Sequence, residues 1–206
     1  MKLYGFRMSG HSHRAELMLN LLNLPYEFVE INLRERESRG AAHLARNPFG
    51  EVPVLEDGDV TIADSTAILV YLASKYDDGR WLPRDPVGAA KVQQWLSNAS
   101  GKVAYGPAAA RMVMVFGAPL ELERAQATAV RLFDVMETVL QGRRWLVGDH
   151  ATIADVAGYS YIAHAPEGGV ALKPYPNIRA WLDNIRALPG FVPLPDTKAG
   201  LAPEVI

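Results

Sequence analysis

The sequence predicts a small α/β domain followed by an all-helical domain. Over residues 1–76, short apolar stretches typical of strands alternate with helical patterns in the order βαβαββα. A segment rich in glycine, proline and charge follows at 77–88, and beyond it no strand pattern recurs. We therefore expect an α/β domain at residues 1–78, a linker at 79–88 and a helical domain at 89–206.

The first elements form a strand–helix–strand unit. Lys2–Phe6 is short, apolar and aromatic, as a strand is, and closely spaced leucines then predict a helix from about Ser12 to Asn23. After Pro25 the apolar alternation of Tyr26–Leu33 predicts a second strand. Two strands joined through one helix imply a parallel pair with a right-handed crossover.

The rest of the α/β domain combines a short helix, a hairpin and a longer helix. A charged, alanine-rich stretch at 35–45 predicts the short helix. The apolar stretches Val52–Glu56 and Val60–Ala63 are joined by Asp57-Gly58, a strong hairpin signal. Asp64-Ser65 then opens a helix whose apolar residues follow the helical period to residue 76.

The second part of the chain has only helical patterns. Two long helices are predicted at 89–116 and 120–141, and a further one at 177–188. Between them, Thr152 and Asp155 have the spacing of a capping box that opens an apolar helix through Tyr161. The tail after Thr197 is punctuated by proline and glycine, and we expect it to be loosely held.

Composition excludes several classes of function. The chain has 21 Lys+Arg against 23 Asp+Glu, and no basic cluster interleaved with aromatics, which argues against nucleic acid. No apolar run is long enough for a membrane span or a signal peptide, so we expect a cytoplasmic protein without membrane contact. The chain has no cysteine and no histidine spacing typical of a metal site, so we expect no metal. Any thiol chemistry must use a thiol from a ligand.

The turn after the first strand is the first candidate site. The sequence Met8-Ser9-Gly10-His11-Ser12-His13-Arg14 leads into a helix N-terminus, where free N–H groups and the helix dipole stabilise an anion. The Ser9 hydroxyl is placed to donate a hydrogen bond to a bound thiolate. Alternatively Ser9 or Ser12 only caps the helix, and Ser12 is nearer the expected cap. His11 or His13 is either a base for the thiol or part of a solvated loop.

Two further sites lie at Val52-Pro53 and at Asp64-Ser65. Pro53 opens a predicted strand, either as an ordinary trans edge proline or as a cis proline that turns the Val52 backbone outward. In the cis case, the Val52 N–H and C=O can pair with an extended peptide by strand addition. Asp64-Ser65 is either a helix N-cap or a grip for the zwitterionic head of an α-amino acid.

The order and spacing of these motifs resemble the N-terminal domain of cytosolic glutathione transferases. The resemblance rests on Ser-x-x-Ser-x-x-Arg after the first strand, then NPFGEVPVLEDGD, then ADSTAILVYLASKY. It is greatest to the serine-type phi, theta and zeta classes, and it covers residues 1–76 densely and 89–188 thinly. It implies a thioredoxin-like first domain with Ser9 as the catalytic serine, and Ser12 or His11 in reserve. It also implies that Pro53 is cis.

The resemblance assigns further residues. Val52, Pro53, Asp64 and Ser65 match the glutathione-binding positions, and the last two match the acid–serine pair that holds the γ-glutamyl end. Arg39 lies where phi enzymes carry a basic residue near the glycyl carboxylate. Glu51 replaces a frequent glutamine, and a carboxylate cannot donate a hydrogen bond as the amide does. The pocket for an apolar electrophile is expected in the helical domain and in the turn between the first strand and the first helix, which contains Ser9 and is called the serine turn below. It is formed by Met8, Tyr105, Met112 and Phe116.

The resemblance also implies a function. The chain is expected to form the thiolate of glutathione for conjugation to, or reduction of, small apolar electrophiles, with possible peroxidase activity. Glutathione is then a co-substrate, no other cofactor is needed, and the protein is a homodimer. The alternatives are a catalytically weak protein-interaction module of the same fold and a zeta-like glutathione-dependent isomerase or dehalogenase.

Overall fold

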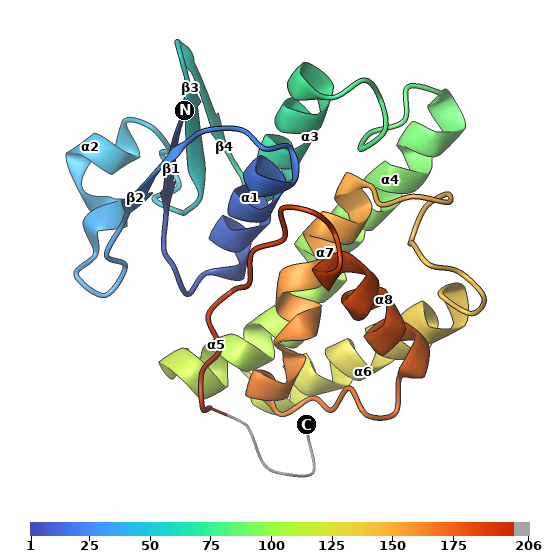
Figure 1. The fold of residues 1–206 in the computed structure, drawn as a ribbon. Helices are drawn as coiled ribbons and strands as arrows, with labels where there is room; N and C mark the ends of the chain where they lie inside the picture. Colours follow the sequence, from blue (N-terminus) through green and yellow to red (C-terminus); the bar gives the residue numbers. More distant parts are fainter. Residues whose placement is uncertain (200–206) are drawn as a thin grey trace.

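The computed structural model describes residues 1–199, which form a four-stranded mixed sheet followed by a bundle of helices (Figure 1). The strands lie in the order β2-β1-β3-β4. The β1/β2 pair is parallel, and β1/β3 and β3/β4 are antiparallel, which confirms the predicted parallel pair and hairpin. The strands are β1 (Lys2–Gly5), β2 (Glu27–Glu30), β3 (Val54–Asp57) and β4 (Val60–Ala63).

Three α-helices accompany the sheet: α1 (Gly10–Leu21), α2 (Ala41–Leu44) and α3 (Ser65–Tyr76). The prediction that the first helix starts at Ser12 is wrong by two residues, because Ser9 is the N-cap of α1. The short helix predicted at 35–45 is also two pieces, a 3-10 turn (Glu37–Arg39, η1) and α2. They are separated at Gly40, whose backbone is extended (φ −71°, ψ 152°).

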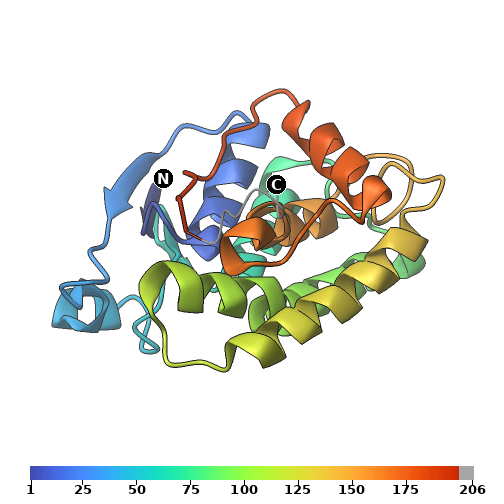
Figure 2. The ribbon, with the colours of Figure 1, turned by 90° about the horizontal axis from the view of Figure 1, so that it is seen from below.

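As far as residue 199, the second domain contains helices and no strand, as predicted (Figures 1 and 2). The helix predicted to begin at Ala89 begins at Pro86, inside the expected linker, because Asp85 caps it through the Gly88 N–H and proline suits the first helical position. The elements are α4 (Pro86–Asn98), η2 (Ala99–Ala108), α5 (Ala109–Phe116), α6 (Leu122–Val139), α7 (Ile153–Ala163), η3 (Ala165–Gly168) and α8 (Pro176–Arg186).

The helix predicted at 89–116 is not regular. Its middle, η2, is π-helical, and Gly106 departs from helical geometry (φ −102°, ψ −105°). Pro107 has no N–H to give to the helix, and a Cβ on Gly106 would lie 3.0 Å from the backbone nitrogen of Ala129 on α6. The helix is therefore kinked at Gly106, where its backbone lies close to α6.

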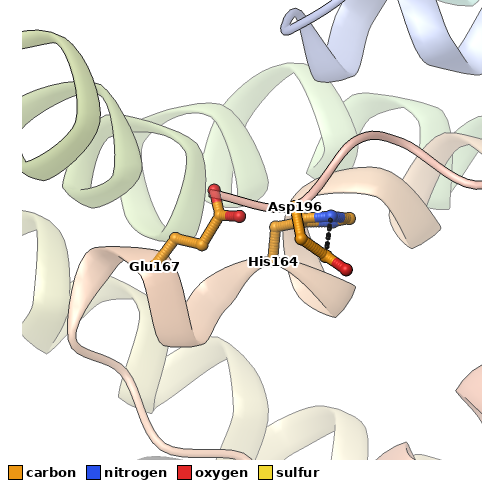
Figure 3. A group of neighbouring side chains, drawn as sticks. All are labelled: His164, Glu167 and Asp196. Atoms are coloured by element: carbon orange, nitrogen blue, oxygen red, sulfur yellow. Dashed lines mark ion pairs between the residues drawn. The ribbon is translucent and has the colours of Figure 1, made fainter. Parts of the chain in front are cut away.

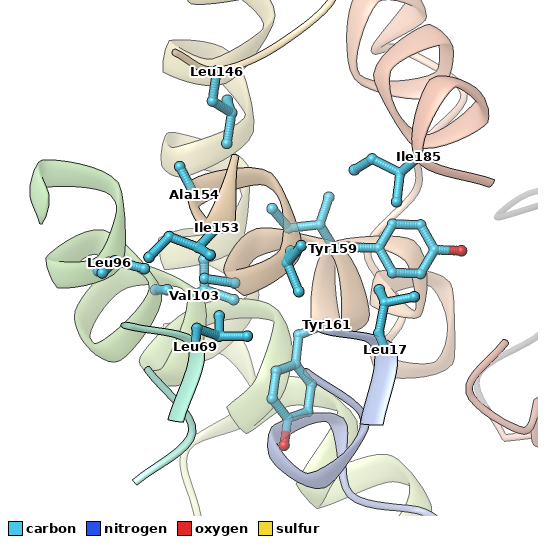
Figure 4. Close-up of a cluster of buried hydrophobic side chains, with 14 of the residues drawn as sticks. Leu17, Leu69, Leu96, Val103, Leu146, Ile153, Ala154, Tyr159, Tyr161 and Ile185 are labelled. Atoms are coloured by element: carbon cyan, nitrogen blue, oxygen red, sulfur yellow. The ribbon is translucent and has the colours of Figure 1, made fainter. Parts of the chain in front are cut away.

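Helix α7 lies at the centre of a core shared by both domains (Figure 4). Leu17 of α1, Leu69 of α3 and Ile153 of α7 are all fully buried in it. The predicted capping box is present: Thr152 and Asp155 exchange side-chain and backbone hydrogen bonds. Because α7 packs against both α1 and α3, the helical domain is fixed directly behind the serine turn.

The last described residues run back across both domains. The Val192 carbonyl lies 2.8 Å from His13 Nε2 of α1, and the Thr197 N–H donates to Glu167. Residues 200–206 of the expected loose tail lie outside the described part of the chain. Within residues 1–199, no helix combines the length and the apolar character needed to cross a bilayer.

Candidate functional site

Two adjoining cavities open at the serine turn. The larger, about 550 Å³, lies between the turn and the helical domain. The smaller, about 450 Å³, lies between α1, the loop before β3 and the start of α3. Both are lined by His11, Glu51 and Val52, so an extended ligand can occupy both at once. The larger is also lined by Phe6, Met8, Ser9, Leu33, Arg34, Ser38, Gly50, Arg111, Met112, Phe116 and Tyr161. The smaller is also lined by Asn47, Pro48, Phe49, Pro53, Ala63, Asp64 and Ser65.

Ser9 lies at the N-terminus of α1 and lines the larger cavity. A tight turn, closed by the Ser9 N–H on the Phe6 carbonyl at 2.9 Å, leads the chain from β1 into the helix. The Ser9 Oγ accepts the Ser12 N–H at 3.3 Å. A hydroxyl that accepts in this way keeps its own proton for another partner. Capping and donation are therefore compatible roles for Ser9.

Ser12 is not placed to contact a ligand. Its side chain is only 1% exposed, and its Oγ accepts the Phe6 N–H at 3.1 Å. It lines neither cavity, and it is not the helix cap that its position suggested. Its hydroxyl instead holds the end of β1 against α1, so the structure does not support Ser12 as a reserve catalytic residue.

The Val52–Pro53 peptide bond is cis, which confirms that part of the prediction. The loop before it is held by two buried side chains, because His43 Nε2 and Asn47 Nδ2 each lie 2.9 Å from the Glu51 carbonyl oxygen. Within residues 1–199, neither the N–H nor the C=O of Val52 has a hydrogen-bond partner in the protein. Both are therefore available to an extended peptide at the junction of the cavities.

Asp64 and Ser65 line the smaller cavity at the start of α3. Asp64 has a positive φ of 74°, and its carboxylate accepts the N–H groups of Thr66 and Ala67, both at 2.9 Å. It is thus the N-cap of α3, as the local sequence indicates. This leaves the Ser65 N–H at the helix start without a partner among the described residues, which suits the carboxylate of a ligand.

A buried positive charge lies behind these groups. Arg14 is 0% exposed, and within residues 1–199 no carboxylate forms an ion pair with it. Its Nη1 donates to His11 Nδ1 at 2.9 Å and to Ser65 Oγ at 3.3 Å, and Nε and Nη2 have no partner in the described protein. Burial lowers the pKa of Arg14 to about 10, so it remains charged at neutral pH. An anion in the smaller cavity would be stabilised by this charge.

The larger cavity has an apolar wall. Met8, Met112 and Phe116 line it together with Phe6, which packs against Phe116 with ring centroids 6.3 Å apart. Tyr105 does not belong to it: the side chain is 73% exposed and precedes the bend at Gly106. The expectation that Tyr105 lines the pocket is therefore wrong, because the π-helical segment changes the direction of its face.

Ser38 of the η1 turn, and not the predicted Arg39, lines the larger cavity. Arg39 is exposed, lines neither cavity and donates from Nη1 to the Phe49 carbonyl at 2.9 Å. Its neighbour Ser38 is 6% exposed and lines the larger cavity, as does Arg34. The sequence analysis missed Arg34 and Ser38, because no pattern in this segment indicates which side of so short a turn faces inward.

Two residues of the helical domain also escaped prediction. Tyr161 of α7 is 4% exposed and lines the larger cavity, with its ring 5.0 Å from that of His11. Arg111 of α5 is 1% exposed, pairs with the buried Glu167 and donates from Nη1 to the Met8 carbonyl. A charged residue in an apolar helix is a weak signal for Arg111, whereas nothing distinguished Tyr161 from the other core aromatics.

One group of side chains among the described residues has the geometry of metal ligands. It consists of His164, Glu167 and Asp196 (Figure 3). Glu167 is already neutralised by Arg111 and accepts the Thr197 N–H, and Asp196 lies 3.1 Å from His164 Nε2. These contacts attach the C-terminal segment to α7 and η3, so we assign the group a structural role.

The chain matches the family models of glutathione S-transferases over both domains. The N-terminal domain model matches residues 3–81, and the C-terminal domain model matches residues 104–189. The probable glutathione S-transferase GSTF2 of Oryza sativa subsp. japonica is 33% identical, over 92% of this chain and 93% of the relative.

Solved structures agree with the sequence comparison. The glutathione S-transferase from Pseudomonas fluorescens Pf-5 is 35% identical, with a TM-score of 0.89 over 95% of this chain and 98% of that one. A glutathione transferase homologue from Drosophila mojavensis with bound glutathione is 32% identical. It has a TM-score of 0.83 over 91% of this chain and 88% of that one.

Proposed function

Because the chain belongs to the glutathione S-transferase family of enzymes, we propose that it activates the thiol of glutathione for attack on small apolar electrophiles. The tripeptide would lie across both cavities. Its γ-glutamyl end would occupy the smaller cavity at Asp64 and Ser65, and its thiol the larger cavity at Ser9. The homologue solved with bound glutathione supports this choice of ligand.

One observation carries this proposal: the unpaired backbone N–H and C=O of Val52 lie where the two cavities meet. An extended peptide can pair with both groups, which would fix its central residue there. Glutathione has its cysteinyl residue in the centre. Pairing with Val52 would therefore direct the sulfur toward Ser9 and the γ-glutamyl head toward Asp64 and Ser65.

Ser9 would stabilise the thiolate. A free thiol has a pKa of about 8.5, and a hydrogen bond from the Ser9 hydroxyl together with the N-terminus of α1 would lower it by about one to two units. This shift corresponds to roughly 1.5–3 kcal/mol in favour of the thiolate. The thiol proton leaves to water, and a pKa of about 6.5 to 7.5 makes roughly a quarter to three-quarters of the bound glutathione a thiolate at pH 7.

The apolar wall of Met8, Met112 and Phe116 would hold the electrophile. The thiolate sulfur forms a bond to the electrophilic carbon, and the leaving group departs with the electrons of the bond that breaks. With a hydroperoxide, the thiolate instead attacks the outer oxygen and an alcohol leaves. The resulting glutathione sulfenic acid reacts with a second glutathione to give the disulfide and water, which completes the peroxidase reaction. Each reaction uses glutathione as co-substrate.

The glycyl end would lie toward η1. We propose Glu51, Arg34 and Ser38 as its neighbours in the larger cavity, and Arg39 could reach it only by leaving the Phe49 carbonyl. A glycyl carboxylate next to Glu51 needs a nearby cation. Arg34 lines the same cavity and fits this need, because Arg111, which also lines it, already pairs with Glu167. Membership of the family also leads us to propose a cytoplasmic homodimer, and light scattering of the purified protein tests the dimer.

Binding and turnover together test this function. Calorimetry should detect glutathione binding at or below millimolar concentration, and a chlorinated nitroaromatic should be conjugated. Ser9→Ala should retain binding and lose most of the turnover. Binding without turnover over a broad panel of electrophiles would favour an interaction module. Turnover of only an isomerase or dehalogenase substrate would favour those reactions instead.

A further inference from the structure

Of the described residues 1–199, His11 is the one side chain outside the loop before β3 that lines both cavities. Val52 and Glu51, the other two residues shared by the cavities, are neighbours in that loop, whereas His11 comes from the first turn of α1. A ligand that passes from one cavity to the other must therefore pass His11. In the proposed function, the part of the ligand at this point is the cysteinyl residue with its sulfur.

The contacts of His11 determine which ring nitrogen carries the proton. Arg14 Nη1 lies 2.9 Å from His11 Nδ1, and a guanidinium can only donate. His11 Nδ1 must therefore accept, and the single proton of the neutral ring is on Nε2. Ser65 Oγ, 3.2 Å from the same Nδ1, accepts from Arg14 and keeps its own proton, because Arg14 already occupies the single lone pair of Nδ1.

The surroundings keep the ring neutral. Burial, followed by the positive charge of Arg14, lowers the pKa of His11 to about 3, and the negative charge of Asp64, the N-cap of α3, opposes this only in part. From α7, the uncharged ring of Tyr161 packs edge-on against His11. At neutral pH the ring is therefore an uncharged donor through Nε2. It cannot accept the thiol proton there, because that nitrogen already holds one.

The Nε2–H has no partner in the described protein. Among residues 1–199 no hydrogen bond reaches it, and it is not one of the buried polar atoms left without a partner. The atom is therefore accessible on a side chain that lines both cavities. His11 therefore carries an unused N–H donor on a side chain that lines the junction.

We propose that His11 is a second catalytic hydrogen-bond donor, whose Nε2–H contacts the sulfur of bound glutathione alongside the Ser9 hydroxyl. The proposal rests on the proposed function, since it needs glutathione in the two cavities. Arg14 acts through His11: by donating to Nδ1 it fixes the tautomer that presents the donor. The role is that of a donor to the thiolate and not of a base.

Two substitutions of His11 distinguish the role of its Nε2–H donor from that of the rest of the ring. His11→Asn keeps an acceptor near Nδ1 for Arg14 but has no atom at the position of Nε2. His11→Gln is longer, and its amide N–H reaches that position. The readouts are the pKa of the bound thiol, from the pH dependence of thiolate absorbance in the ultraviolet, and the pH profile of kcat/KM with a chlorinated nitroaromatic.

We expect His11→Asn to raise the pKa of the bound thiol by about one unit. This lowers kcat/KM about tenfold below that pKa and has little effect well above it. His11→Gln should recover most of the loss. Affinity for S-methylglutathione, which has no ionisable thiol, should change less than threefold in both variants. That measurement also confirms that the site is folded.

An unchanged thiol pKa in His11→Asn would overturn the proposal, as would a His11→Gln variant as impaired as His11→Asn. A loss of S-methylglutathione affinity with an unchanged thiol pKa would also overturn it, because His11 would then hold the peptide and not the sulfur. If the unmodified protein neither binds glutathione nor lowers its thiol pKa, the proposed function itself fails. If Ser9→Ala raises the thiol pKa and His11→Asn does not, only this inference fails.

Discussion

Arg111 of α5 donates a hydrogen bond from Nη1 to the carbonyl oxygen of Met8 at 2.8 Å. This contact joins the helical domain to the residue immediately before Ser9. Arg111 is held in place by the buried Glu167, which also accepts the Thr197 N–H of the C-terminal segment. The position of the serine turn therefore depends on an ion pair in the other domain.

Removing either partner of this ion pair should be costly. Arg111→Met leaves the Glu167 carboxylate buried without its counter-charge, and we expect a loss of about 3–5 kcal/mol in the free energy of unfolding. The double variant Arg111→Met/Glu167→Gln removes both charges and should be less destabilised than Arg111→Met. Denaturant unfolding of the variants measures this. If the double variant lost as much stability as Arg111→Met and Glu167→Gln lose separately when summed, the two charges would not be coupled.

Gly10 is needed for the approach of Tyr161 to the start of α1. A Cβ on Gly10 would lie 2.7 Å from Cζ of the Tyr161 ring, whereas one on Gly101 would meet nothing within 4 Å. We expect Gly10→Ala to cost about 1–3 kcal/mol through overpacking and to lower turnover by displacing the serine turn. Gly101→Ala is the control and should change neither the stability nor the turnover. Equal thermal stability of the two variants would contradict this account of the turn.

His13 should make the protein less stable in acid. Its Nδ1 lies 2.8 Å from Ser160 Oγ and its Nε2 2.8 Å from the Val192 carbonyl oxygen, and burial lowers its pKa from 6.5 to about 4. Between these pH values the unfolded chain binds a proton at His13 that the folded chain does not. Stability therefore falls as the pH is lowered through this window, by up to about 3 kcal/mol.

His13→Gln does not titrate, so its free energy of unfolding should depend less on pH between 6.5 and 4. Denaturant unfolding at several pH values compares the two slopes. Any overall loss of stability from the lost hydrogen bonds appears at every pH and does not affect this comparison. An unchanged slope would mean that His13 is not held neutral in the fold.

Asp64 and Asp85 cap helices of nearly equal length, but only Asp64 lines a cavity. Replacing either with alanine should cost about 1 kcal/mol of stability through loss of the cap. Asp64→Ala should in addition raise the KM for glutathione about tenfold or more, because the carboxylate would no longer hold the γ-glutamyl ammonium group. Asp85→Ala should leave this KM unchanged. If Asp64→Ala and Asp85→Ala had the same effect on the KM for glutathione, Asp64 would not be part of the binding site.

Elements that begin or end at a residue-specific turn or helix cap could be predicted from the sequence. Asp57-Gly58 forms the hairpin turn, with Gly58 at a φ of 61°, and the predicted strand Val60–Ala63 matches β4. The box of Thr152 and Asp155 starts α7 as expected. In each case a backbone requirement limits the residue types, so local sequence is enough.

Directions of side chains could not be predicted in the same way. Ser9 and Ser12 were both possible caps, and the choice depends on where the turn after β1 closes. Tyr105 lies in a π-helical stretch, where counting by 3.6 residues per turn gives the wrong face. The buried Arg111 depends on Glu167, which lies far along the chain, and no local pattern indicates such a partner.

The pKa of the glutathione thiol in the binary complex tests the central claim most directly. It is measured from thiolate absorbance as a function of pH, for the unmodified protein, for Ser9→Ala and for Ser9→Thr, which keeps a hydroxyl. We predict a pKa about one to two units below the free thiol for the unmodified protein, a return toward the free value in Ser9→Ala, and partial recovery in Ser9→Thr. A bound thiol as weakly acidic as the free one, or an equal pKa in Ser9→Ala, would contradict the account.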